Sequence, residues 1–322
     1  MREIIIDTFG TPDVLQLRES APPAAGPGDV LVSVAFAGLN PIDYKMRDGS
    51  SGQAKNLELP AVLGREMSGH VIGAADDVDL EALGMPVGSP VFGVRTLGDM
   101  RGAYAETVAF SAHDLCPVPG AEPDLRAYAG LALAGTTAQT ALEDDARLRP
   151  GETLLVHGGT GGVGQLLIPL ALQAGAARVL ATGRAENAER IRELGGEPIA
   201  YDTEDWAERV LAETRGRGVD VVIDLHYFTT FLPSLDVLAD DGRIVAVPSL
   251  ADLAPARERG IRASVTRMSP SRGRLQQLAQ GHASGLLPLE VAAVLPLAEA
   301  GRGHEVLESG HARGKIVLET HA

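Results

Sequence analysis

The residues LLVHGGTGGVGQ, at positions 154–165, give the strongest indication of the architecture of this chain. A run of apolar residues typical of a buried strand leads into a glycine-rich turn, and a second apolar run of helical length follows. Gly159, Gly161 and Gly164 have the spacing G-x-G-x-x-G, which suits a tight turn, close backbone approach to a pyrophosphate, and close packing of helix on strand. The helix N-terminus attracts phosphate through free N–H groups and a partial positive charge. We therefore expect a dinucleotide-binding loop, with a purely structural turn as the alternative, formed by Gly159, Thr160, Gly161, Gly162, Val163 and Gly164.

Strands rich in Val, Ile and Leu alternate with helices throughout the segment that contains this loop. The expected strands are 152–158, 177–183, 196–202, 219–225, 243–249 and 261–268, and the expected helices are 164–176, 185–196, 205–216 and 231–242. Such alternation, with near-continuous apolar strands, predicts a doubly wound parallel sheet covered on both faces.

The remainder of the chain has a different pattern. Before residue 122 short strands such as DVLVSVAFAGL, residues 29–39, are separated by Gly and Pro, and a helix is expected from about residue 124 to 145. The last strand, within GHARGKIVLET, has no place in a finished six-stranded sheet, so we expect it to return to the first domain. The predicted domains are 1–122 with 269–322, rich in β-strands, and 123–268, which binds the dinucleotide.

Composition excludes several classes of function. The 322 residues carry a formal net charge of −15, which disfavours a nucleic-acid binder because such proteins need a basic face. No apolar run reaches the length of a membrane helix, and the N-terminus does not resemble a secretory signal, so a cytoplasmic protein without membrane contact is expected. Cys116 is the one cysteine, so a disulfide framework or a multi-cysteine zinc site is excluded within the chain.

The end of the second expected strand, ATGR at residues 181–184, indicates which dinucleotide binds. NAD sites place an acid about twenty residues after the glycine loop, where it holds the ribose 2′-hydroxyl. This chain has Arg184 there, and a guanidinium suits a 2′-phosphate instead. We therefore predict NADPH, with NAD as the alternative, and expect Thr182, Gly183 and Arg184 to contact it.

Six segments together resemble the zinc-independent medium-chain dehydrogenase/reductases, of the quinone oxidoreductase and enone reductase branch. They are AGLNPIDYKMRDG, LPAVLGREMSGHV, GAYAETV, LALAGTTAQTAL, HGGTGGVGQLLIPLALQAGA and LESGHARGKIVLE, and the resemblance covers the whole chain. It implies an α/β fold: a GroES-like, β-rich catalytic domain built from both ends of the chain, with a Rossmann domain inserted. It also implies a homodimer formed through the last Rossmann strand.

The zinc ligands of the metal-dependent relatives are replaced in this chain. Asn40 stands where those relatives carry a catalytic cysteine, and Gly64-Arg65-Glu66 stands where they carry G-H-E, so no metal is expected. Glu66 is expected to pair with a neighbouring cation, Arg65 or another arginine. Arg65 itself is either structural or a residue of the substrate pocket.

Three candidate catalytic residues follow from the resemblance, which places Asn40, Tyr44 and Thr137 near the nicotinamide. Asn40 and Thr137 can also be explained by local structure without a catalytic role, whereas Tyr44 cannot. Asn40 can cap a helix that begins at Pro41, with Asp43 accepting a hydrogen bond in its first turn. The Thr137 hydroxyl can bond back within its own helix.

Two departures from the relatives affect the site. Asn187 replaces a lysine that often helps to hold the 2′-phosphate, so the NADPH prediction depends on Arg184, while Tyr201 matches a tyrosine near the adenine. His226, Tyr227 and Phe228 replace a pair of small residues after the fourth Rossmann strand. Ligands bind at the carboxyl ends of such strands, so His226 and Tyr227 are expected in the substrate pocket, unless the loop merely packs over the sheet.

The sequence thus predicts an NADPH-dependent enzyme that reduces small-molecule quinones or α,β-unsaturated carbonyls without a metal. One alternative is an enoyl-thioester reductase of a biosynthetic pathway. The other is a non-redox biosynthetic or binding protein that retains the nucleotide site.

Overall fold

The computed structural model describes residues 1–310 and 312–321 and divides the chain into two compact units. The first comprises Met1–Leu133, Pro270–Ser284 and Leu289–Ala322, and the second comprises Ala134–Ser269 and Gly285–Pro288. Each unit has its own sheet and apolar core.

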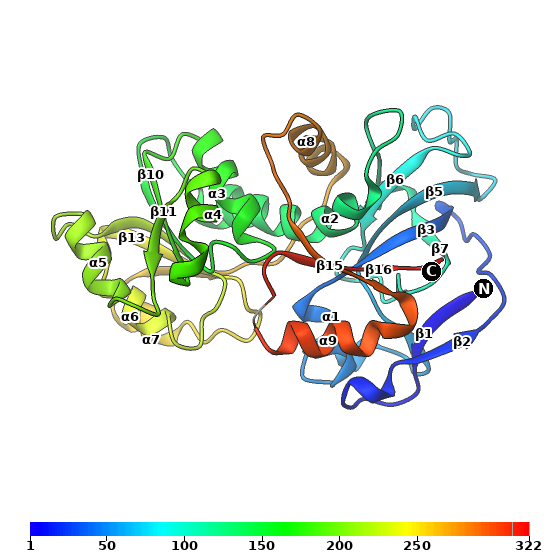
Figure 1. Ribbon diagram of the computed structural model, residues 1–322, viewed down its shortest axis with the longest axis horizontal. Coiled ribbons are helices and arrows are strands. Elements are labelled where there is room, and N and C mark those ends of the chain that lie inside the picture. Colours follow the sequence, from blue (N-terminus) through cyan, green and yellow to red (C-terminus); the bar gives the residue numbers. More distant parts are fainter. Residues whose placement is uncertain (311, 322) are drawn as a thin grey trace. The chain divides into compact units, whose positions relative to one another are not determined.

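The first unit is built on a mixed sheet with strand order β15-β16-β3-β5-β6-β8, in which β7 also pairs with β3. These strands are β3 (Asp29–Leu39), β5 (Glu66–Ala74), β6 (Pro90–Val94), β7 (Thr107–Ser111), β8 (Leu115–Pro117), β15 (Val291–Pro296) and β16 (Lys315–Glu319). β16 runs antiparallel to β3, with Ile316 opposite Leu39 (Figure 1). The expected return of the C-terminal strand to the first domain is therefore confirmed.

A smaller sheet and several helices complete this unit. The sheet has the order β2-β1-β4, with β1 (Arg2–Ile6), β2 (Gln16–Glu19) and β4 (Ala61–Val62). The helices include α1 (Pro41–Arg47), α8 (Arg272–Ala283) and α9 (Ala300–Glu308). Ile4, Met67 and Phe110 are fully buried in the core.

The second unit contains a parallel sheet with the order β11-β10-β9-β12-β13-β14. Its strands are β9 (Thr153–His157), β10 (Arg178–Gly183), β11 (Glu197–Ala200), β12 (Val219–Asp224), β13 (Leu238–Ala246) and β14 (Arg262–Val265). Numbered along the chain the order is 3-2-1-4-5-6, that of a Rossmann fold, and the predicted doubly wound sheet is confirmed. Leu155, Leu180 and Val222 are fully buried between the layers.

The helices of the second unit are α3 (Gly164–Gln173), α4 (Ala188–Glu193), α5 (Trp206–Glu213), α6 (Phe231–Ser234) and α7 (Ala254–Glu258). The helix expected near residues 124–145 is also found, as α2 (Leu125–Gln139) continued by a π-helical segment, Thr140–Ala146. Within the described residues, no helix combines the length and apolar character needed to cross a membrane.

The expectation of a helix over residues 231–242 is wrong. The helix ends at Ser234, and the chain enters β13 already at Leu238, which pairs with Val219. Short apolar runs do not distinguish helix from strand by periodicity, and here pairing with β12 decides for the strand.

Candidate functional site

The glycine loop between β9 and α3 has the close packing that its spacing predicts. A Cβ atom on Gly159 would lie 2.8 Å from Cβ of Ala181, and one on Gly164 would lie 2.2 Å from the carbonyl oxygen of Gly158. Gly161 is less crowded: its nearest neighbour would be the Gly158 oxygen, at 3.4 Å. Gly159 and Gly164 are therefore needed for close packing of helix on strand, whereas Gly161 leaves space beside the turn for a ligand. This arrangement fits a pyrophosphate held against the N-terminus of α3.

Thr182 and His157 support the loop from the sheet. The Thr182 hydroxyl accepts from the backbone N–H of Gly158 at 3.2 Å and lies 3.2 Å from Nδ1 of His157. The other ring nitrogen, Nε2, lies 2.9 Å from the Ser234 hydroxyl. Burial lowers the pKa of His157 to about 4, so the ring is neutral at physiological pH. The sequence pattern does not single out His157, because a histidine at the end of a buried strand carries no motif of its own.

Arg184 and Tyr201 lie together at the carboxyl end of this sheet. Arg184 directly follows β10 and Tyr201 follows β11. Hydrogen bonding to Tyr201 raises the pKa of Arg184, whose side chain is exposed to solvent. The two residues predicted to hold the adenine end of a cofactor are thus neighbours, and the guanidinium is available to an anion.

The turn after β12 places His226 and Tyr227. The buried carboxylate of Asp224 accepts from the backbone N–H groups of both, at 2.9 and 2.8 Å. Tyr227 has a left-handed backbone, with φ of 72°, and its phenol accepts from the N–H of Asp252 at 2.7 Å. His226 is exposed, and Phe228 beside it is 70 % exposed. The tyrosine therefore closes the turn, while the histidine faces solvent at the edge where ligands bind in such sheets.

In the first unit, Asn40, Glu66 and Lys315 form a buried polar cluster. Lys315 Nζ donates to Glu66 Oε1 at 2.8 Å and to the side-chain oxygen of Asn40. The Asn40 amide donates to the same Glu66 oxygen at 2.9 Å, and Glu66 Oε2 accepts from the N–H of Leu133 at 2.7 Å. Glu66 therefore pairs with a cation, as expected, but the expected arginine is wrong, because the cation is Lys315 of the C-terminal strand.

Asn40 begins helix α1, as its sequence predicts. The Asp43 carboxylate accepts from the backbone N–H of Asn40 at 2.8 Å, and Pro41 occupies the first helical position. Since both polar atoms of the Asn40 side chain bind within the cluster and the residue is 2 % exposed, the arrangement favours a positioning role.

A chain of buried polar side chains continues from Asp43 to the surface. Tyr104 donates its phenol hydrogen to Asp43 Oδ2 at 2.9 Å, and its oxygen lies 3.3 Å from Nε2 of His304. On the far side, Nδ1 of His304 lies 3.4 Å from Nη1 of Arg47, which also donates to Glu308. Burial and the charge of Arg47 lower the pKa of His304 to about 3, so the ring is neutral. Because Arg47 can only donate, Nδ1 accepts from it, and the ring hydrogen lies on Nε2, which donates to Tyr104.

Tyr44 and Thr137 occupy different environments. Tyr44 is half-buried on α1, and burial, followed by the charges of Glu308 and Asp48, raises the pKa of its phenol. Thr137 is 6 % exposed and belongs to α2.

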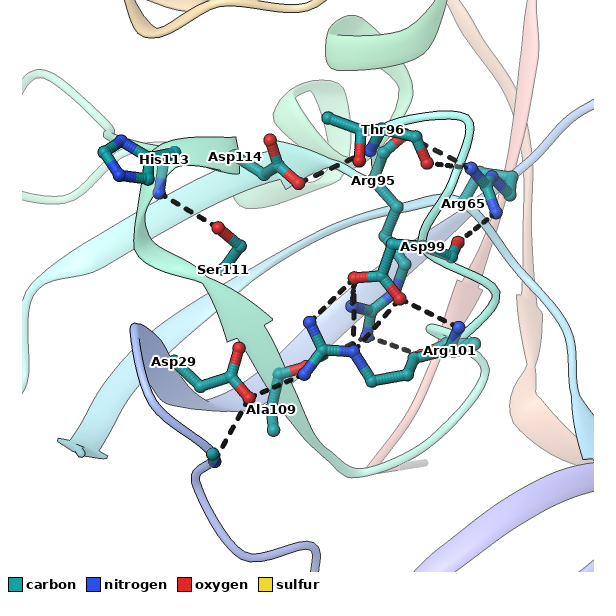
Figure 2. Close-up of polar contacts among 12 residues, drawn as sticks. Asp29, Arg65, Arg95, Thr96, Asp99, Arg101, Ala109, Ser111, His113 and Asp114 are labelled. Carbon is teal, nitrogen blue, oxygen red and sulfur yellow. Dashed lines mark hydrogen bonds and ion pairs between the residues drawn. The ribbon is translucent and has the colours of Figure 1, made fainter.

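Arg65 belongs to a network of charged residues drawn in Figure 2. Its guanidinium donates to the backbone oxygens of Asp99 and Thr96 and is 6 % exposed. Asp99 in turn binds Arg95 and Arg101, which, against the effect of burial, lower its pKa to about 2. These contacts favour a structural role for Arg65, whose hydrogen bonds fix the backbone of the loop that follows β6.

Among residues 1–310 and 312–321, no three or more His, Cys, Asp or Glu side chains lie together in a way that could hold a metal ion. The positions that bind zinc in metal-dependent relatives are taken up by the Asn40 cluster and the Arg65 network.

Comparison with known proteins identifies the family. The alcohol dehydrogenase GroES-like domain matches residues 26–120, and a domain described as zinc-binding dehydrogenase matches residues 194–318. The 2-haloacrylate reductase of a Burkholderia species is 31 % identical over 98 % of this chain and 97 % of its own. The chain belongs to the zinc-independent medium-chain dehydrogenase/reductases.

Solved structures of this dehydrogenase/reductase family agree. The quinone oxidoreductase of Coxiella burnetii is 34 % identical, with a TM-score of 0.91 over 99 % of both chains. The quinone oxidoreductase of Escherichia coli, solved with NADPH, is 28 % identical, with a TM-score of 0.87 over 99 % of this chain and 100 % of its own. The family is one of oxidoreductases, and the predicted GroES-like and Rossmann architecture is confirmed.

Proposed function

We propose that this protein reduces quinones or α,β-unsaturated carbonyl compounds with NADPH and without a metal. The observation that carries the proposal is the open glycine loop followed, at the end of the next strand, by an exposed arginine beside a tyrosine. A guanidinium at that place suits a 2′-phosphate. The names of the relatives, quinone oxidoreductase and 2-haloacrylate reductase, support reduction of small conjugated substrates.

The reaction needs a group that stabilises negative charge on the substrate oxygen. Bound NADPH would supply the hydride, and the negative charge that arrives with it would collect on the oxygen of an enolate or of a quinol anion. Without a metal, a fixed hydrogen-bond donor is required there. Tyr44 is the donor we propose, because its phenol is protonated at neutral pH and can donate without ionising. Asn40 positions α1, and Thr137 is proposed to contact the nicotinamide.

The direct test follows the absorbance of NADPH during incubation with a panel of quinones and enones. Turnover with at least one compound, faster with NADPH than with NADH, is expected. Tyr44→Phe is expected to lower turnover at least about tenfold while NADPH affinity stays the same, because one donor to a developing oxyanion commonly contributes about 100-fold or more. Tyr128→Phe, which removes a phenol outside the proposed site, is the matched control. Equal turnover of Tyr44→Phe and the parent would show that Tyr44 only packs.

We propose a homodimer assembled through β14, which lies at one end of the Rossmann strand order and so leaves an edge to pair. Light scattering during size-exclusion chromatography measures this, and a monomeric mass would contradict it.

A further inference from the structure

Asp43 is a buried carboxyl with one oxygen that no residue satisfies. Its Oδ2 accepts from the Asn40 N–H and from the Tyr104 phenol. Its Oδ1 has no hydrogen-bond partner within residues 1–310 and 312–321, although Asp43 is only 1 % exposed. A buried polar atom left without a partner is unfavourable, so its retention points to a ligand or a reaction.

Asp43 lines a small cavity of the first unit. The remaining wall is mostly apolar, with Met46, Leu63 and Met100 among its side chains, and includes Arg65. The cavity volume is about 10 Å³, which is room for one oxygen atom rather than a ring. Because Oδ2 is occupied by two donors, Oδ1 is the oxygen that remains for a group in this cavity.

The hydrogen-bond chain behind Asp43 decides which oxygen carries a proton when the carboxyl is neutral. His304 donates to the Tyr104 oxygen, so the single phenol hydrogen of Tyr104 is directed at Asp43 Oδ2. With two donors on Oδ2, a neutral carboxyl must carry its hydrogen on Oδ1. Arg47 ends the chain and does not release protons, so the chain positions Asp43 and does not conduct protons.

We propose that Asp43 supplies the proton of the reduction, passing the hydrogen on Oδ1 to a substrate oxygen that enters the cavity. This inference rests on the proposed function, in which Tyr44 stabilises the negative charge as it develops on the substrate oxygen; Asp43 then neutralises that charge with a proton. In an enone the hydride, with its electron pair, adds to carbon and the proton adds to oxygen. A quinone gains the same hydride and proton, and the product tautomerises to the quinol if the hydride has added to a ring carbon. The Oδ1–H bond of Asp43 breaks as the O–H bond of the enol or quinol forms. Solvent water then returns a proton to the Asp43 carboxylate, so each turnover consumes one proton.

The electrostatics of the cavity suit a proton donor near neutral pH. Burial raises the pKa of Asp43 to about 6, against the Tyr104 and Asn40 hydrogen bonds and the charges of Lys315 and Arg65, which lower it. Glu66, the remaining charged neighbour in this cluster, binds Lys315 and raises the pKa of Tyr104. A group with a pKa close to the working pH is populated in both forms and exchanges its proton efficiently.

The decisive variant is Asp43→Asn. The amide oxygen can replace Oδ2 and accept from Asn40 and Tyr104, while the NH₂ group replaces Oδ1 and still donates into the cavity. The variant therefore keeps the hydrogen bonds and removes only the transferable proton. In the parent we expect kcat/KM to be greatest below pH 6 and to fall about tenfold per pH unit above it, as neutral Asp43 is depleted. In Asp43→Asn we expect about 100-fold lower turnover below pH 6 and no such fall.

Two further variants separate this role from a structural one. Tyr104→Phe removes a hydrogen bond that lowers the Asp43 pKa, so the fall in kcat/KM should move to higher pH. Asp114→Asn is the matched control: its carboxyl also has a pKa raised by burial but does not line the cavity, and the profile should not change. The titration of the Asp43 carboxyl, followed by carbon-13 NMR without cofactor, should give the same pKa values as the rate profiles.

The outcomes separate the two proposals. If the parent reduces no quinone or enone, the proposed function fails and this inference fails with it. If the parent is active and Asp43→Asn retains its turnover and pH profile, the inference alone is overturned. Should Asp43→Asn not fold, Tyr104→Phe carries the test, and a profile that does not move to higher pH overturns the inference.

Discussion

The buried pair of Lys315 and Glu66 allows a sharp prediction about the stability of the first unit. Lys315 Nζ binds the Leu39 carbonyl, the Asn40 side-chain oxygen and Glu66 Oε1, and Gly130 makes room for the lysine stem, since a Cβ there would lie 2.9 Å from Lys315 Cβ. Lys315→Met keeps most of the stem and removes only the charged donor. The substitution therefore measures what the charged amino group of Lys315 contributes to the free energy of unfolding.

The magnitude follows from what remains after the substitution. Glu66 is 0 % exposed and keeps its hydrogen bonds from Asn40 and Leu133, but its negative charge loses the cation. Removing one partner of a buried ion pair destabilises a protein by about 3–5 kcal/mol, because the remaining charge is neither solvated nor neutralised. The double variant Glu66→Gln/Lys315→Met removes both charges of this pair and should lose clearly less stability than the single variant, although the two sites are in contact and their effects are not additive.

Urea denaturation followed by far-ultraviolet circular dichroism measures these differences. Trp206, the one tryptophan of the chain, lies in the second unit, so its fluorescence reports on that unit separately. A loss below about 1 kcal/mol for Lys315→Met, the range of an exposed ion pair, would refute the reasoning. If the double variant is as unstable as the single variant, the unpaired charge of Glu66 is not the cause of the lost stability.

Three other predictions concern the site. Arg184→Ala should narrow the preference for NADPH over NADH about tenfold or more, since a charge-assisted contact contributes about 1.5–3 kcal/mol. Arg192→Ala is the control and should leave the preference unchanged. If Arg184→Ala also leaves it unchanged, the 2′-phosphate binds elsewhere. His226→Ala should raise the KM for the substrate about 2- to 10-fold without changing NADPH affinity, as expected for loss of one hydrogen bond. A complex with both His226 and Tyr227 turned away from the substrate would contradict this prediction. Untagged protein should contain no stoichiometric zinc and should keep its activity with a chelator.

The sequence was sufficient for the parts of the fold that depend on local pattern. The glycine spacing at Gly159 to Gly164 predicts a strand, a turn and a helix, and the alternation of strands and helices predicts the parallel sheet. The pattern failed at Leu238, where an apolar stretch after a short helix pairs with β12 instead of continuing the helix. Local periodicity cannot reveal such a pairing, because it is decided by a neighbouring strand.

The candidate site was harder to predict, because its contacts join distant residues. Asn40 as the start of α1 follows from the preference of asparagine for the N-cap position and from the proline after it, although its side chain binds Glu66 and Lys315 instead of capping the helix. The lysine that pairs with Glu66 lies 249 residues further along the chain, and no local signal connects the two. Similarly, the sequence indicates that Asp43 caps a helix but not that one of its oxygens is left for a cavity.

The central claim, hydride transfer from NADPH to a conjugated substrate, is tested most directly with NADPH deuterated at C4 of the nicotinamide. The enzyme is incubated with an enone that it reduces, and the product is examined by mass spectrometry and deuterium NMR. We expect one deuterium at the β-carbon of the product, transferred from one face of the nicotinamide only. A reduced product that carries no deuterium on carbon would contradict hydride transfer from NADPH. So would a panel in which no quinone or enone causes NADPH to be oxidised.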